Sequence, residues 1–68
     1  MTLRFEKWEG LGNDYLLVDR MEFGDRDPKS WTVRWSDRNY GVGSDGLILV
    51  GEHPLSMRIF NADGSEGA

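Results

Sequence analysis

The sequence predicts an α+β fold in which two strands, one helix and two further strands follow one another. Short apolar runs with strand character lie on both sides of a central charged stretch. That stretch leads into a helix-start signal at Asp27-Pro28, and polar turns that contain glycine separate the apolar runs. At 68 residues the chain has room for one small domain at most. Strands and a helix grouped in this way are typical of the α+β class.

The first two strands flank a glycine-rich turn. A mixed run from Leu3 to Trp8 is predicted as the first strand, and it ends at Gly10-Leu11-Gly12. The compact apolar run from Tyr15 to Val18 is predicted as the second strand. Because this run is apolar throughout, we expect it to be buried on both faces and to pair with the first strand.

The helix is predicted from Pro28 to Asn39, after a charged loop from Glu22 to Lys29. Asp27 has a side chain that accepts backbone N–H bonds at a helix N-terminus, and proline fits the first helical position. Gly41 is placed to end the helix.

Two tryptophans mark one face of this helix. Trp31 and Trp35 are four residues apart and share that face, with Arg34 and Arg38 on an adjacent row. The alternation of Trp31, Val33 and Trp35 also fits a strand, which is the alternative to a helix here.

Two more strands are predicted in the last third of the sequence. The run from Leu47 to Val50 forms the third strand, and His53-Pro54 interrupts the chain after it. In the fourth strand Leu55, Met57 and Ile59 alternate with Ser56, Arg58 and Phe60. Residues 61–65 have the composition of a turn. Four strands and one helix leave sheet edges unpaired, which indicates that further structure covers them.

Charge and hydropathy exclude several classes of protein. The chain has 8 Lys and Arg against 12 Asp and Glu, a net charge of −4. The basic residues are scattered among acidic ones, so no basic face is available to neutralise nucleic-acid phosphates. The longest apolar run, Leu47 to Val50, is far shorter than the roughly 20 residues that span a bilayer, and the N-terminus lacks a signal-peptide pattern. We therefore expect a cytoplasmic protein that binds neither nucleic acid nor membranes.

No motif for a metal or a cofactor is found. The chain has no cysteine and one histidine, His53, which lies beside a proline in an expected exposed turn. The glycines from Gly41 to Gly46 have the spacing that opens a dinucleotide fingerprint. They lie between a helix and a strand, however, where that fingerprint needs a strand and then a helix. We expect no metal and no cofactor.

Three polar turns are the candidates for a binding site: Gly10 to Asp14, Gly41 to Gly46, and Asn61 to Ser65. Glycine lets a backbone pass close to a ligand, and an asparagine amide offers both a donor and an acceptor. One interpretation is that Asn13 and Asn61 converge on a small polar substrate. The other is that all three segments are ordinary turns, and the residue types alone favour this second interpretation.

Taken in order, the three segments resemble the opening of the diaminopimelate epimerase family. The similar blocks are residues 5–15, 37–47 and 57–66. They contain Gly10-Leu11-Gly12-Asn13-Asp14, Gly41-Val42-Gly43-Ser44-Asp45-Gly46 and Asn61-Ala62-Asp63-Gly64-Ser65-Glu66. Their order and spacing fit over nearly the whole chain. One departure is Trp8-Glu9, where the family commonly has Met-His.

The resemblance implies a fold and an activity. The family has two similar α+β domains, each with a curved, mostly antiparallel sheet around a central helix, and residues 1–68 would form part of the N-terminal domain. The implied reaction interconverts LL- and meso-diaminopimelate, for lysine and peptidoglycan biosynthesis, without pyridoxal phosphate or metal. Two cysteines, one from each domain, act as thiolate base and thiol acid. The family protein is expected to be a homodimer.

The resemblance also assigns roles to single residues. Asn13 and Asn61 match the substrate-binding asparagines of the N-terminal domain. No catalytic residue is expected within the chain, because the first catalytic cysteine of the family follows the block at residues 57–66 by a few positions, and the sequence ends at Ala68. We expect an enzyme segment that is inactive without the remainder. The alternatives are an amino-acid-binding module of the same fold, or part of a related proline or hydroxyproline epimerase.

Overall fold

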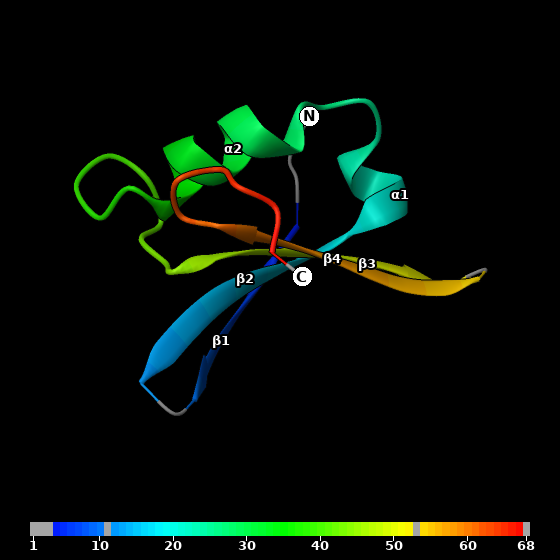
Figure 1. The fold of residues 1–68 in the computed structure, drawn as a ribbon, viewed down its shortest axis with the longest axis horizontal. Helices are drawn as coiled ribbons and strands as arrows, with labels where there is room; N and C mark the ends of the chain where they lie inside the picture. Colours follow the sequence, from blue (N-terminus) through cyan, green and yellow to red (C-terminus); the bar gives the residue numbers. More distant parts are fainter. Residues whose placement is uncertain (1–3, 11, 53, 68) are drawn as a thin grey trace.

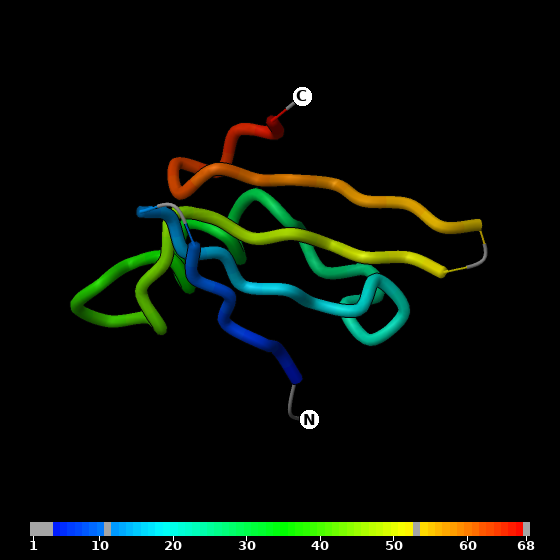
Figure 2. The backbone as a smooth tube through the Cα atoms, turned by 90° about the horizontal axis from the view of Figure 1, so that it is seen from below, coloured from blue at the N-terminus to red at the C-terminus, as the bar shows by residue number. Residues whose placement is uncertain are grey.

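The computed structural model describes residues 4–10, 12–52 and 54–67. Four strands form one sheet: β1 (Glu6–Gly10), β2 (Asn13–Asp19), β3 (Gly46–Glu52) and β4 (Leu55–Asn61). They lie side by side in chain order, as Figure 2 shows. The β1–β2 and β3–β4 pairs are antiparallel and the β2–β3 pair is parallel. The α+β prediction, with a mostly antiparallel sheet, is confirmed.

Two helices connect β2 to β3, and both lie on the same side of the sheet (Figure 1). They are α1 (Arg20–Phe23) and α2 (Pro28–Ser36). The core lies between these helices and the sheet face beneath them, and the aromatic rings of Trp31 and Trp35 pack against it. Its fully or almost fully buried side chains are Leu16, Val18, Phe23, Leu47, Leu49 and Phe60. The opposite face, which we call the open face, carries no helix in the described part of the chain.

The start of α2 follows the predicted signal. The helix begins at Pro28, and the Asp27 carboxylate accepts a hydrogen bond of 3.3 Å from the Lys29 amide. Trp31 and Trp35 lie on one face of this helix, with their rings edge to face and their centroids 5.1 Å apart. The helix prediction is therefore confirmed over the strand alternative.

The predicted end of α2 at Asn39 is wrong, because the helix ends at Ser36. The Asp37 carboxylate accepts hydrogen bonds from the Asn39 and Tyr40 amides, at 2.7 and 3.0 Å, and so starts a turn instead of another helical turn. Gly41 does not end the helix through a positive φ. It lies against the helix end, where a Cβ atom would be 2.7 Å from the Trp35 carbonyl oxygen and closer still to that of Arg34.

The charged stretch from Glu22 to Lys29 is not wholly a loop, because its first two residues belong to α1 and its last two to α2. The Asp19 carboxylate caps α1 by accepting a 2.7 Å hydrogen bond from the Met21 amide. Gly24 ends it with a φ of 63°. Phe23 fills the core from this single turn, so a local cap and one buried ring outweigh the charged composition.

The prediction that β2 is buried on both faces is also wrong. Leu16 and Val18 are buried, whereas Tyr15 and Leu17 are only half-buried, because the helices cover a single face. The pairing of this strand with β1 is confirmed.

The boundaries of the other strands differ from the predicted runs. The first strand is shifted toward the turn, from Leu3–Trp8 to Glu6–Gly10. The third strand, predicted from Leu47 to Val50, is longer at both ends. Leu3, Leu11 and His53 lie outside the described residues.

β4 alternates as predicted, but the buried ring belongs to the second set of side chains. Phe60 is fully buried, whereas Leu55 and Met57 are 80% and 61% exposed on the open face.

None of the helices in the described part of the chain has the length and apolar character needed to cross a bilayer.

Candidate functional site

Asn13 and Asn61 lie at the same end of the sheet and on the same face. Asn13 is the first residue of β2 and Asn61 is the last residue of β4. In the sheet register Asn61 pairs with Gly46, and Gly46 pairs with Tyr15. Because side chains alternate along a strand, Asn13, Tyr15 and Asn61 all belong to the open face.

The surface between the two asparagines consists of glycine backbone and an aromatic ring. Two interstrand spacings, about 10 Å, separate β2 from β4. Gly46 lies between them, and a Cβ atom there would be 2.9 Å from Cε1 of Tyr15. The Tyr15 ring therefore lies over Gly46, with Asn61 beside Gly46 on β4 and Asn13 two residues before Tyr15 on β2. This arrangement offers an apolar floor between two polar groups.

Asn13 also lines a small cavity of about 370 Å³ beside the β1–β2 turn. Asn61 does not line this cavity. The structure thus brings the two asparagines to one face and one end of the sheet, but not into one enclosed pocket. The other residues that line it are Glu9, Gly10, Gly12, Asp14, Arg38 and Asp45.

Asn61 is held by the turn that follows it. Its Nδ2 donates a 3.0 Å hydrogen bond to Oγ of Ser65, and its backbone amide donates to the Ser65 carbonyl oxygen at 2.8 Å. Asp63 accepts bonds from the hydroxyl and the amide of Ser65, which lowers the pKa of the Asp63 carboxyl. One N–H of the Asn61 amide is thus engaged in the turn. The side-chain oxygen Oδ1 and the second N–H of Nδ2 have no partner among the hydrogen bonds of the described residues.

The same turn packs on α2. Gly64 has a φ of 90°, and a Cβ atom there would lie 3.1 Å from both the Lys29 carbonyl oxygen and Cγ2 of Val33. Only glycine combines that backbone conformation with so close an approach. The helix therefore sets the position of the Asn61 turn.

Next to Asn13, the side chain of Asp14 belongs to a cluster that the sequence did not indicate, formed by Asp14, Arg38 and Asp45. The Asp14 carboxylate accepts hydrogen bonds from Nη2 of Arg38 at 3.1 Å and from the Asp45 amide at 3.1 Å. Nη2 of Arg38 also lies 3.3 Å from Oδ1 of Asp45, and Nζ of Lys7 lies 3.4 Å from Oδ2 of Asp14. These contacts, chiefly that of Arg38, lower the pKa of Asp14 to about 2.

Arg38 was expected on the helix row beside Arg34, and that expectation is wrong because α2 ends at Ser36. Beyond the helix the guanidinium turns toward Asp14, and this pairing raises the pKa of Arg38. Asp14 and Asp45 are 31 residues apart. No local spacing predicts their contact, and only the parallel pairing of β2 with β3 could have suggested it.

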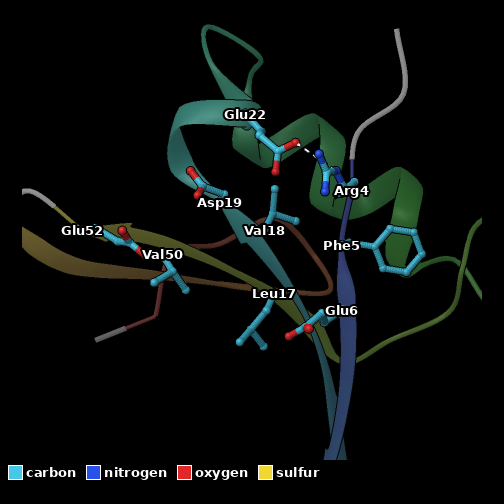
Figure 3. Close-up of a pocket in the computed structure, with 9 residues that line it drawn as sticks. All are labelled: Arg4, Phe5, Glu6, Leu17, Val18, Asp19, Glu22, Val50 and Glu52. Carbon is cyan, nitrogen blue, oxygen red and sulfur yellow. Dashed lines mark ion pairs between the residues drawn. The ribbon is translucent and has the colours of Figure 1, made fainter.

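A larger cavity, of about 710 Å³, lies at the other end of the sheet, away from both asparagines (Figure 3). The ends of β2 and β3 and the start of β1 form it. Two of its acidic groups already have partners, because Asp19 caps α1 and Glu22 lies 3.7 Å from Nε of Arg4.

No group of three metal-ligating side chains occurs among the residues that the structure describes.

Comparison with family models and comparison with curated proteins give different results. No family model matches the chain. Curated diaminopimelate epimerases do match it: that of Parabacteroides distasonis is 44% identical over 68 residues, and that of Synechococcus elongatus is 49% identical over 71. The enzyme of Bacteroides thetaiotaomicron is 48% identical over 67 residues. These alignments cover 96%, 97% and 94% of this chain, respectively.

The same alignments cover only part of each relative. The chain spans 25% of the length of each of these three proteins. The aligned region includes the segments that carry Asn13 and Asn61, since it is almost the whole chain. Over almost its whole length the chain is similar to diaminopimelate epimerases, and it corresponds to about a quarter of each of these proteins.

Proposed function

We propose that the chain is the N-terminal part of a diaminopimelate epimerase, in which residues 1–68 form part of the first of two domains. The whole protein would interconvert LL- and meso-diaminopimelate for lysine and peptidoglycan biosynthesis. The observation that carries this proposal is the placement of Asn13 and Asn61 on one face and at one end of the sheet. It is supported by the alignment of almost the whole of this chain with a quarter of the length of proteins of that name.

In this proposal the chain binds and orients the substrate and does not itself transfer protons. Diaminopimelate has a polar amino-acid group at each end and an aliphatic chain between them. The amides of Asn13 and Asn61 would bind polar groups of the substrate, and the Tyr15 ring over Gly46 would contact its methylene groups. Orientation matters because an α-proton is a very weak acid. The substrate must therefore be held with that proton directed at the thiolate that removes it.

The two thiols, base and acid, would come from residues beyond these 68, since the chain has no cysteine. The remainder of the enzyme is thus the principal partner, and a homodimer is proposed for the whole protein. The net charge of −4 argues against nucleic-acid binding, and we propose a cytoplasmic enzyme that does not bind membranes. Neither a metal nor pyridoxal phosphate is part of the proposed reaction.

The proposal is tested with a chimera in which this chain replaces the matching first quarter of the Parabacteroides distasonis enzyme. Deuterium entry from D₂O into the α-position of diaminopimelate is followed by mass spectrometry. We expect exchange and epimerisation. A folded chimera that exchanges no α-proton would contradict the proposal. Exchange into proline but not diaminopimelate would instead favour the related proline epimerases, and titration that shows binding without exchange would favour the binding module.

Substitution of the two asparagines tests their role in the same chimera. A hydrogen bond to a charged group contributes about 1.5–3 kcal/mol. We therefore expect Asn13→Ala and Asn61→Ala each to lower kcat/KM by about 10-fold or more. Leu55→Ala is the matched control, because Leu55 is 80% exposed at the far end of β4. Unchanged kcat/KM in both asparagine variants would remove these residues from the site.

A further inference from the structure

Asn13 and Asp14 lie beyond the end of the β2–β3 ladder. The parallel register starts at Tyr15, which pairs with Gly46. On the other side, β1 is exposed along its whole length, so no burial fixes the register of the β1–β2 turn. Ladder hydrogen bonds to β1 alone therefore hold the residue that points at the proposed substrate.

Two hydrogen bonds between Asp14 and Asp45 extend the contact between the two strands beyond the end of the ladder. The Asp45 amide donates to the Asp14 carbonyl oxygen at 2.8 Å, and the Asp14 amide donates to Oδ2 of Asp45 at 2.9 Å. The first bond joins two backbones, and in the second a carboxylate takes the place of a missing backbone carbonyl. Together they tie the start of β2 to the segment before β3.

Arg38 ties both carboxylates to a third segment. Its guanidinium lies 3.1 Å from Oδ1 of Asp14 and 3.3 Å from Oδ1 of Asp45. Without this cation the two carboxylates would repel each other across the contact. The segment that follows α2 is thus joined to the start of β2 and to the segment before β3.

We propose that Asp14, Arg38 and Asp45 form a clamp whose function is to position Asn13 for the substrate. Adjacent residues of a strand point to opposite faces, so fixing the Asp14 side chain on the helix-covered face directs Asn13 onto the open face. The inference rests on the proposed function for its substrate, but the geometric part concerns this chain alone. These three are positioning residues, since each acts through Asn13.

The geometric part is tested on the 68-residue chain by ¹⁵N relaxation. We expect amide order parameters of about 0.85 at residues 12–14 in the unsubstituted chain. In Asp14→Asn and in Arg38→Met we expect these order parameters to fall to about 0.6. Glu22→Gln, which breaks an ion pair at the other end of the sheet, is the control and leaves these values unchanged. Equal order parameters in all four proteins would overturn the clamp. Arg38→Met covers the case in which Asp14→Asn does not fold.

The functional part is tested by a double-mutant cycle in the chimera. If Asp14 acts through Asn13, Asp14→Asn lowers kcat/KM about 10-fold alone and has no further effect in the Asn13→Ala background. Arg38→Lys keeps the cation and recovers part of the loss that Arg38→Met causes. Effects of Asp14→Asn and Asn13→Ala that multiply would show that Asp14 does not act through Asn13. An inactive unsubstituted chimera would contradict the proposed function, and the relaxation experiment would then decide the clamp.

Discussion

Arg58 and Glu66 are joined by two hydrogen bonds of 3.0 Å, from Nε to Oε2 and from Nη2 to Oε1. This pair closes the turn that carries Asn61, where Phe60 and Glu66 also form an isolated antiparallel bridge. The guanidinium of Arg58 further lies 5.1 Å from the centroid of the Phe60 ring. The end of β4 is therefore fastened both by its backbone and by an ion pair.

Glu66→Gln is expected to lower the melting temperature slightly, and more at low salt than at high salt. Both side chains are partly exposed, so solvent and ions screen the pair. The measurement is thermal unfolding by circular dichroism at two salt concentrations. Asp25→Asn, which removes an exposed carboxylate between the helices, is the matched control. A loss that does not respond to salt would contradict an electrostatic cause.

Phe60→Ala is expected to destabilise the chain by about 3–5 kcal/mol, because the ring is fully buried among the core residues of β2 and β3. Met57→Ala, three residues earlier in the same strand, serves as the control, since its side chain is 61% exposed on the open face. We expect that variant to stay within about 0.5 kcal/mol of the parent. Chemical unfolding measures both, and equal losses would mean that the open face is a second core.

Gly41→Ala is expected to cost about 1–3 kcal/mol, since a methyl group there would press on the last carbonyl groups of α2. The amides of Val42 and Gly43 both donate to the Trp35 carbonyl oxygen at 2.9 Å, and the displaced loop would weaken both bonds. Gly10→Ala provides the comparison, because no atom lies within 4 Å of a Cβ atom at Gly10. If the two alanine variants unfold at the same denaturant concentration, the close approach at Gly41 has no energetic weight.

Stability is expected to fall as the pH drops from about 4 toward 2. The pKa of Asp14 is lowered from 3.8 to about 2, chiefly by the hydrogen bond with Arg38 and further by Asp45 and Lys7. A carboxyl whose pKa is lower in the folded state stabilises that state above its unfolded pKa, and this contribution is lost as the pH falls through the folded pKa. Asp37 and Asp63 act in the same direction, through hydrogen bonds from Asn39 and from Ser65, respectively. The measurement is chemical unfolding across this pH range.

Asp14→Asn tests the share of Asp14 in that acid sensitivity. The variant is expected to be less stable at pH 5 and to lose less stability between pH 4 and 2 than the parent chain. Parallel pH profiles for the two proteins would show that the carboxylate of Asp14 contributes nothing to the dependence.

The sequence predicted those features whose causes are local. The start of α2 depends on Asp27 and Pro28, which are adjacent, so the capping signal was sufficient. The end of the helix depends on the turn that Asp37 starts and on amides of residues 42–44 that fold back onto the helix end. No pattern within the helix records either. The burial of β2 on one face likewise depends on where the two helices lie.

The candidate site was only partly predictable for the same reason. Residue types alone favoured ordinary turns around Asn13 and Asn61, and the resemblance of three blocks in order made them candidates. The contact of Asp14 with Asp45 joins residues 31 positions apart. It exists because β2 and β3 run parallel, which was not predicted from the apolar runs.

That parallel pair also divides the molecule into two hairpins of different folding character. The β1–β2 and β3–β4 contacts are local in the sequence, so each hairpin can form within microseconds. The β2–β3 ladder must bring together residues about thirty positions apart, and it completes the sheet only after that long loop has closed. We therefore expect folding of this chain to be limited by the docking of two preformed halves.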